Sequence, residues 1–119
     1  MAKLDLNVLA KTDPAQQYQV IEFRGEMDKS NITDVRSTLG PFMDTLQDKA
    51  LIFDMTYFDF INSEGVGLMV SFFYKMQTAG KQLFFTQPQP QVADVFELIG
   101  LTKVTQPVAD VATAVSQIQ

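Results

Sequence analysis

The sequence contains neither cysteine nor histidine. The lack of cysteine excludes disulfides and thiolate nucleophiles, and the lack of histidine removes the commonest general base of enzymes. Cysteine and histidine are also the usual ligands of zinc. No glycine-rich phosphate loop, nucleophile elbow or metal-spaced cluster is present. The carboxylates of Asp54, Asp59 and Glu64 have no histidine or neighbouring basic residue to act with. The sequence therefore predicts a protein that is not an enzyme and that uses no cofactor or metal.

Basic residues are also scarce. Nine lysines and arginines stand against 14 acidic residues, which gives a formal net charge of −5. Binding to nucleic acid requires a concentrated basic surface, so no nucleic-acid partner is expected. The segment MAKLDLNVLA lacks the apolar core of a signal peptide, and the longest apolar stretch, Val66–Tyr74, is too short to span a bilayer. We expect a cytoplasmic protein with no direct membrane insertion.

Length and composition are those of one globular domain. The chain has 119 residues, of which 46% are hydrophobic and 19% charged. A chain of this size can bury a single substantial core, and its composition is not that of a disordered segment. We therefore predict one domain over residues 1–119.

Alternating apolar and polar residues predict the strands. The segments KLDLNVLAK (3–11) and YQVIEFRG (18–25) have this period, the second with apolar residues on both faces, and the polar turn between them predicts an antiparallel hairpin. Three further strands are predicted in ALIFDM (50–55), KQLFFTQ (81–87) and TKVT (102–105).

Apolar residues at steps of three and four predict the helices. One begins near Ser30, and Gly40-Pro41 predicts a kink or a split in it. A second, ended by Gly80, is apolar nearly all round. Its inward face is predicted to comprise Val66, Met69, Val70, Phe73 and Gln77. A second stripe, expected to face a neighbouring helix or a partner, comprises Leu68, Phe72 and Met76. Two shorter helices are predicted over residues 91–100 and 110–119.

The order of these elements indicates the fold class. A hairpin is followed by alternating helices and strands, and β-α-β connections place successive strands parallel. We predict an α/β fold in which a mixed sheet of four to five strands, with an N-terminal hairpin and then parallel strands, packs against about four helices.

The segment FINSEGVG (60–67) lies where a predicted strand leads into the second helix. A serine at this place favours helix capping by Ser63, and Asn62 can serve the same purpose. Glu64 suits the positive end of the helix dipole. Gly65 and Gly67 relieve crowding against the sheet or let a partner approach. An exposed Ser63 would also be a favourable position for a phosphate.

Three segments of the chain together resemble the STAS-domain family of anti-sigma factor antagonists. VIEFRGEMD (20–28) is similar to that family's second strand and Gly-Glu-Leu-Asp turn. LIFDMTYFDFINSEGVGLM (51–69) resembles its strand followed by Asp-Ser-Ser/Thr-Gly-Leu-Gly, and AGKQLFFTQPQPQVADVFELIGL (79–101) resembles its C-terminal pattern. The resemblance extends over nearly the whole chain and implies a single STAS domain.

The resemblance also implies a function. In that family, the serine or threonine after the motif aspartate is phosphorylated by a partner serine kinase of the histidine-kinase-like ATPase type, which is an anti-sigma factor or acts beside one. The corresponding residue is Ser63. Unphosphorylated, the domain would bind this partner and free a sigma factor as a monomer or weak homodimer. The implied partner surface comprises Gly25, Glu26, Met27, Asp28, Asn62, Ser63, Glu64, Gly65, Val66 and Met69.

The sequence departs from the family motif on both sides of Ser63. Asn62 replaces the aspartate and Glu64 replaces the second hydroxyl residue, so one negative charge moves from before the serine to after it. This change would alter partner specificity. It also leaves open a second function, that of an unphosphorylated STAS adaptor subunit in a membrane transport assembly.

Overall fold

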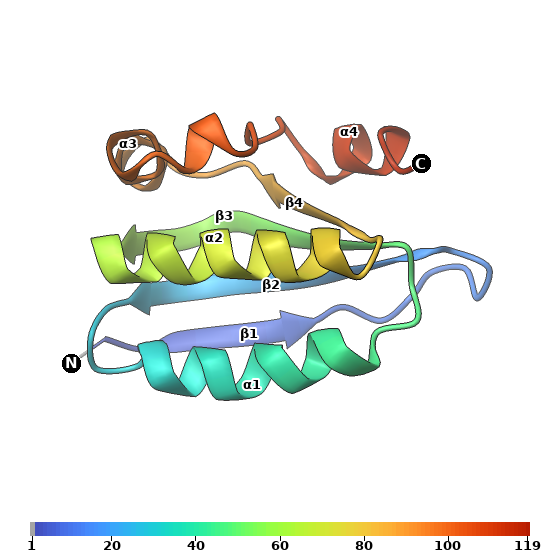
Figure 1. Ribbon diagram of the computed structural model, residues 1–119, viewed down its shortest axis with the longest axis horizontal. Coiled ribbons are helices and arrows are strands. Elements are labelled where there is room, and N and C mark those ends of the chain that lie inside the picture. Colours follow the sequence, from blue (N-terminus) through green and yellow to red (C-terminus); the bar gives the residue numbers. More distant parts are fainter. Residues whose placement is uncertain (1) are drawn as a thin grey trace.

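The computed structural model describes residues 2–119 and contains a mixed sheet with strand order β1-β2-β3-β4 (Figure 1). Strand β1 (Leu4–Val8) pairs antiparallel with β2 (Tyr18–Met27). Strands β3 (Ala50–Ile61) and β4 (Gln82–Thr86) continue the sheet in parallel. The predicted hairpin followed by parallel strands is confirmed, and with it the α/β fold class.

Helices cover both faces of the sheet, but unequally. The larger core lies between one face and helices α1 (Ile32–Thr45), α2 (Ser63–Thr78) and α3 (Pro90–Ile99). Helix α4 (Val111–Ser116) packs on the opposite face, where Ala114 joins a small second core. Strand β2 contributes to both cores, as its two apolar faces predicted.

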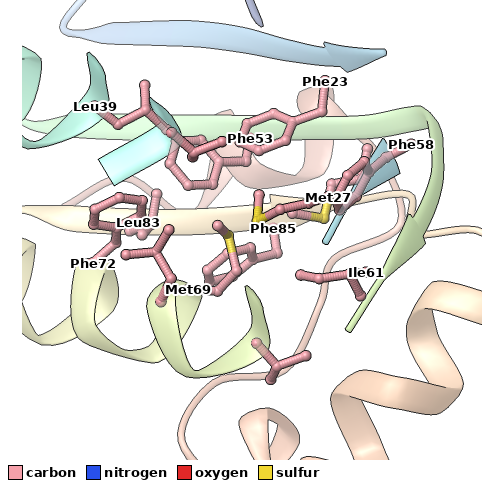
Figure 2. Packing of buried hydrophobic residues seen from close by; sticks show 14 of the residues in the cluster. Phe23, Met27, Leu39, Phe53, Phe58, Ile61, Met69, Phe72, Leu83 and Phe85 are labelled. Atoms are coloured by element: carbon pink, nitrogen blue, oxygen red, sulfur yellow. The ribbon is translucent and has the colours of Figure 1, made fainter. Parts of the chain in front are cut away.

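Phe53 lies at the centre of an aromatic cluster in the larger core (Figure 2). Its ring centroid lies 4.8 Å from that of Phe23, 5.6 Å from that of Phe85 and 6.4 Å from that of Phe72. These four side chains join the strands β2, β3 and β4 to helix α2. All are buried, and the tilted and edge-on geometries are those that aromatic pairs prefer.

The predicted strand at residues 102–105 is wrong. The chain instead forms a short 3-10 helix, Leu101–Lys103, directly after helix α3. The Leu101 side chain is fully buried, and its carbonyl oxygen accepts hydrogen bonds from the N–H groups of Val104 and Thr105. Burial of Leu101 thus outweighs the β propensity of the residues that follow. The chain returns to the sheet only at the isolated bridge between Thr86 and Val108.

Helix α1 is continuous, so the predicted split at Gly40-Pro41 did not occur. Pro41 lacks the N–H that would bond to the carbonyl of Ser37. Because Ser37 is exposed, water can satisfy that carbonyl, and the helix tolerates the proline.

The predicted inward face of helix α2 is only partly correct. Val66 and Met69 are buried, but Gln77 is exposed and Val70 and Phe73 are only partly covered. The second stripe is core instead, and comprises Leu68, Phe72 and Met76. Helix α2 contacts helices α1 and α3 as well as strand β4, so a wider part of its surface is buried than the sheet alone would cover.

Strand β3 extends through Ile61, six residues beyond the predicted end at residue 55, and is irregular near its C-terminal end. Gly25 of β2 lies opposite Phe58 of β3. The next residue of β2, Glu26, lies opposite Phe60, so Asp59 is an extra residue in β3. This bulge reverses the alternation of side chains, because a single inserted residue shifts those after it to the other face of the sheet. Phe60 is therefore exposed while Phe58 is buried.

Replacing Phe53 by alanine is expected to lower the free energy of unfolding by about 3–5 kcal/mol, because a cavity would remain at the centre of the aromatic cluster. Phe60→Ala is the matched control. Its side chain is 46% exposed, so a change of less than about 0.5 kcal/mol is expected. Urea denaturation followed by circular dichroism measures both values, and similar losses would contradict this description of the core.

Candidate functional site

The segments predicted to form a partner surface lie side by side at one end of the sheet. Met27, the last residue of β2, pairs with Ile61, the last residue of β3. The N–H of Asn62 then donates to the carbonyl oxygen of Met27 at 3.3 Å. The start of helix α2 is therefore attached to the end of β2, although the two are far apart in the sequence.

Asn62, and not Ser63, caps helix α2. The Asn62 backbone is extended, with φ −94° and ψ 176°, and its side-chain oxygen accepts the N–H of Gly65 at 2.8 Å. Ser63 is already the first helical residue, so its hydroxyl is not in the position that caps a helix. The capping prediction for Ser63 is wrong, and the alternative at Asn62 is correct. Ser63 is exposed, and its hydroxyl forms no hydrogen bond within residues 2–119.

Gly65 allows helix α2 to approach the strand ends. A Cβ at this position would lie 2.6 Å from Cγ1 of Ile61 and 3.1 Å from Sδ of Met27. Both separations are too short for ordinary packing, so any side chain would push the helix away from the sheet. A Cβ at Gly67, by contrast, would meet no such neighbour within 4 Å. Crowding therefore explains Gly65 and not Gly67.

Gly25–Met27 belong to strand β2 rather than to the predicted turn. Gly25 has a φ of +116°, and a Cβ there would lie 2.1 Å from the carbonyl oxygen of Lys3. Only glycine fits this place in the hairpin.

The turn itself begins at Asp28. The Asp28 carboxylate accepts the N–H of Ser30 at 2.8 Å and its hydroxyl at 2.6 Å. The bond from the Ser30 hydroxyl, and to a smaller extent that from the Ser30 N–H, lowers the pKa of Asp28 and keeps its carboxylate ionised. Asn31 accepts the N–H of Asp28 at 3.0 Å and donates to the carbonyl oxygen of Glu26 at 2.9 Å.

Burial divides the ten predicted partner residues into two groups. Met27, Gly65, Val66 and Met69 are buried, so they support the surface but do not offer side chains to a partner. The other six are exposed or half-buried and comprise Gly25, Glu26, Asp28, Asn62, Ser63 and Glu64.

Two exposed residues at this end of the sheet, Asp59 and Phe60, were missed by sequence reasoning. The side chain of Gln89 donates to the Asp59 carboxylate at 3.1 Å, and that of Gln91 donates to the Asp59 carbonyl oxygen at 3.1 Å. The Gln89 side chain also donates to the carbonyl oxygen of Thr56 at 2.8 Å. The start of helix α3 thus holds the bulge in place. No local pattern in the sequence indicates a bulge, because it depends on the pairing of β3 with β2.

The charge of this end of the sheet is negative. It carries four carboxylates, those of Glu26, Asp28, Asp59 and Glu64, against two exposed lysines, Lys3 and Lys29. The ion pairs within residues 2–119 join Lys11 to Asp48, Arg24 to Glu22 and Lys75 to Asp44, so none of the four takes part in one.

Two other kinds of feature are absent from the described part of the chain. Residues 2–119 contain no group of three or more acidic residues placed to hold a metal ion. Among the same residues, no helix has the length and apolar character needed to cross a bilayer.

The fold defines the class of protein. The structure has the fold of anti-sigma factor antagonists. The family model described as the STAS domain matches residues 10–114, and the chain belongs to the STAS domain family.

Solved structures agree on the fold. An anti-sigma factor antagonist from Mycobacterium paratuberculosis is 18% identical with a TM-score of 0.80, over 98% of this chain and 94% of that chain. The anti-sigma factor antagonist SpoIIAA in its unphosphorylated form is 20% identical with a TM-score of 0.74, over 98% and 96%. The Bacillus cell fate determinant SpoIIAA in the phosphorylated form is 19% identical with a TM-score of 0.67, over 98% and 100%.

Asn62→Ala is expected to lower the free energy of unfolding by about 1 kcal/mol, because the N–H of Gly65 would lose its cap. Ser63→Ala should change it by less than about 0.5 kcal/mol, since no hydrogen bond within residues 2–119 is lost. Chemical denaturation of both variants measures the difference. A larger loss for Ser63→Ala would show that serine is the cap.

Gly65→Ala and Gly67→Ala form a second matched pair on the same helix. Gly65→Ala should destabilise the domain by about 1–3 kcal/mol, because the new methyl group would overlap Ile61. Gly67→Ala meets no neighbour and should stabilise it by about 0.5–1 kcal/mol. Thermal unfolding of the two variants compares them, and equal shifts would exclude close contact as the reason for Gly65.

Proposed function

We propose that this domain is an anti-sigma factor antagonist, a non-enzymatic module that binds an anti-sigma factor and thereby frees a sigma factor. The partner is a serine kinase of the histidine-kinase-like ATPase type. The observation that carries the proposal is the hydroxyl of Ser63, which is exposed at the first turn of α2 and forms no hydrogen bond within residues 2–119, while Asn62 performs the capping. The fold shared with antagonists, one of them solved in both phosphorylation states, supports it.

When Ser63 is phosphorylated, the domain no longer binds the anti-sigma factor. The Ser63 oxygen attacks the γ-phosphorus of ATP in the kinase, a Ser63 O–P bond forms and the bond to the leaving ADP breaks. The hydroxyl proton passes to a base of the kinase. The phosphoserine carries about −1.5 to −2 charges at neutral pH.

The modification leaves the fold intact and acts on the partner. Ser63 contributes no hydrogen bond within residues 2–119 to the domain, and the N-terminal end of a helix tolerates a negative group. A phosphate there occupies space at the end of the sheet that also carries Glu26, Asp28 and Glu64, and so prevents the partner from docking.

The test uses purified histidine-kinase-like serine kinases encoded in the same genome, with wild-type protein and Ser63→Ala. One kinase should bind both proteins in a pull-down and should transfer labelled phosphate from ATP only to wild type. Wild type phosphorylated to completion, confirmed by intact mass, should bind at least about tenfold more weakly. The proposal is wrong if no kinase binds wild type, or if label persists in Ser63→Ala.

A further inference from the structure

Phe60 is an apolar side chain that the fold places in solvent. Its side chain is 46% exposed, whereas the neighbouring strand residues Phe58 and Ile61 are 0% and 1% exposed. The bulge at Asp59 causes this difference, because in regular alternation from Phe58 the side chain of Phe60 would point into the core. Two glutamine side chains hold the bulge by hydrogen bonds to Asp59. The exposure of Phe60 is therefore built into the end of β3.

Phe60 also borders a hollow at the surface. A cavity of about 330 Å³ is lined by Ala2, Glu26, Asp28 and Phe60. Strand pairing places Glu26 directly opposite Phe60. We call the surface formed by Glu26, Asp28, Asp59, Phe60 and Glu64 the Phe60 face. It lies at the same end of the sheet as Ser63, since Asn62 is bonded to the end of β2.

The Phe60 face combines one aromatic side chain with four carboxylates. None of these carboxylates is neutralised by an ion pair within residues 2–119. Asp28 remains ionised because its two hydrogen bonds from Ser30 lower its pKa. An exposed aromatic group beside charged residues is typical of a protein interface, in which the aromatic group is desolvated and the charges guide association.

We propose that Phe60 is the anchor of the docking surface, and that the partner offers an apolar pocket surrounded by lysine and arginine side chains. This inference rests on the proposed function and specifies the chemistry of its partner. Charge complementarity selects this occupant. A second copy of the chain would bring like charges together on the Phe60 face and is disfavoured for that reason.

The inference also specifies how phosphate acts. A phosphate on Ser63 adds negative charge to a surface whose partner is cationic, so the charge alone would not repel the partner. The phosphate acts by its bulk. Ser63→Gln and Ser63→Glu have side chains of nearly equal size and differ in charge. Ser63→Glu should therefore weaken binding no more than Ser63→Gln does.

The test measures the dissociation constant of the kinase that labels Ser63, by calorimetry with full-length proteins. Phe60→Ala should raise it at least about tenfold. Leu98→Ala, which removes an apolar side chain that is 82% exposed on helix α3, should change it less than about twofold. Circular dichroism of each variant confirms that it is folded.

The charge of the partner is tested with two double variants. The double variant Glu26→Gln/Glu64→Gln should weaken binding and reduce the dependence of binding on sodium chloride. The control, Asp94→Asn/Glu97→Gln, removes the same charge from exposed positions on helix α3 and should leave that dependence as in wild type.

Failure of this inference is distinguishable from failure of the proposed function. If no kinase binds wild type, both fall together. If the kinase binds wild type but Phe60→Ala and Leu98→Ala have equal dissociation constants, only the Phe60 anchor is wrong. If the two double variants show the same dependence on sodium chloride, only the cationic partner is wrong. Sedimentation velocity completes the test, because a dimer that dissociates in Phe60→Ala would assign the Phe60 face to a second copy and overturn the proposal.

Discussion

The parallel pairing of β2 with β3 determines the position of every residue at the candidate site. It brings Met27 opposite Ile61, and the N–H of Asn62 then bonds to the carbonyl oxygen of Met27. Helix α2 starts at that point and can lie close to both strand ends only because residue 65 is glycine. Since interiors are closely packed, a shift of the strand ends would move the helix start and Ser63 with it.

Asn62 and Ser63 have separate roles at the start of α2. Capping by Asn62 satisfies a backbone donor of the first turn, and Ser63 is therefore released from any structural hydrogen bond within residues 2–119. A hydroxyl that served as the cap would have to give up its bond to be modified. Asn62 departs from the family motif, but like an aspartate it has a side-chain oxygen that can accept the N–H of the third helical residue.

Much of the architecture could be predicted from local patterns. The hairpin, the two following parallel strands and the helix ended by Gly100 follow from alternation, helical spacing and glycine at a helix end. The errors have one kind of cause. The residues after Leu101 have the β-branched composition of a strand, but burial of Leu101 at the end of α3 outweighs it. Likewise, contacts with two other helices bury a broader part of α2 than its own periodicity indicates.

The sequence by itself determined the α/β class, the absence of thiol and imidazole chemistry, and the place of Ser63 near the start of a helix, because composition and period are local properties. The tertiary structure decided which residue caps that helix, which of the ten predicted partner residues reach the surface, and that Phe60 does so as well. These outcomes depend on the register between strands that are distant in the sequence. A single extra residue, Asp59, reverses the face on which Phe60 lies, and only the pairing with β2 shows that it is extra.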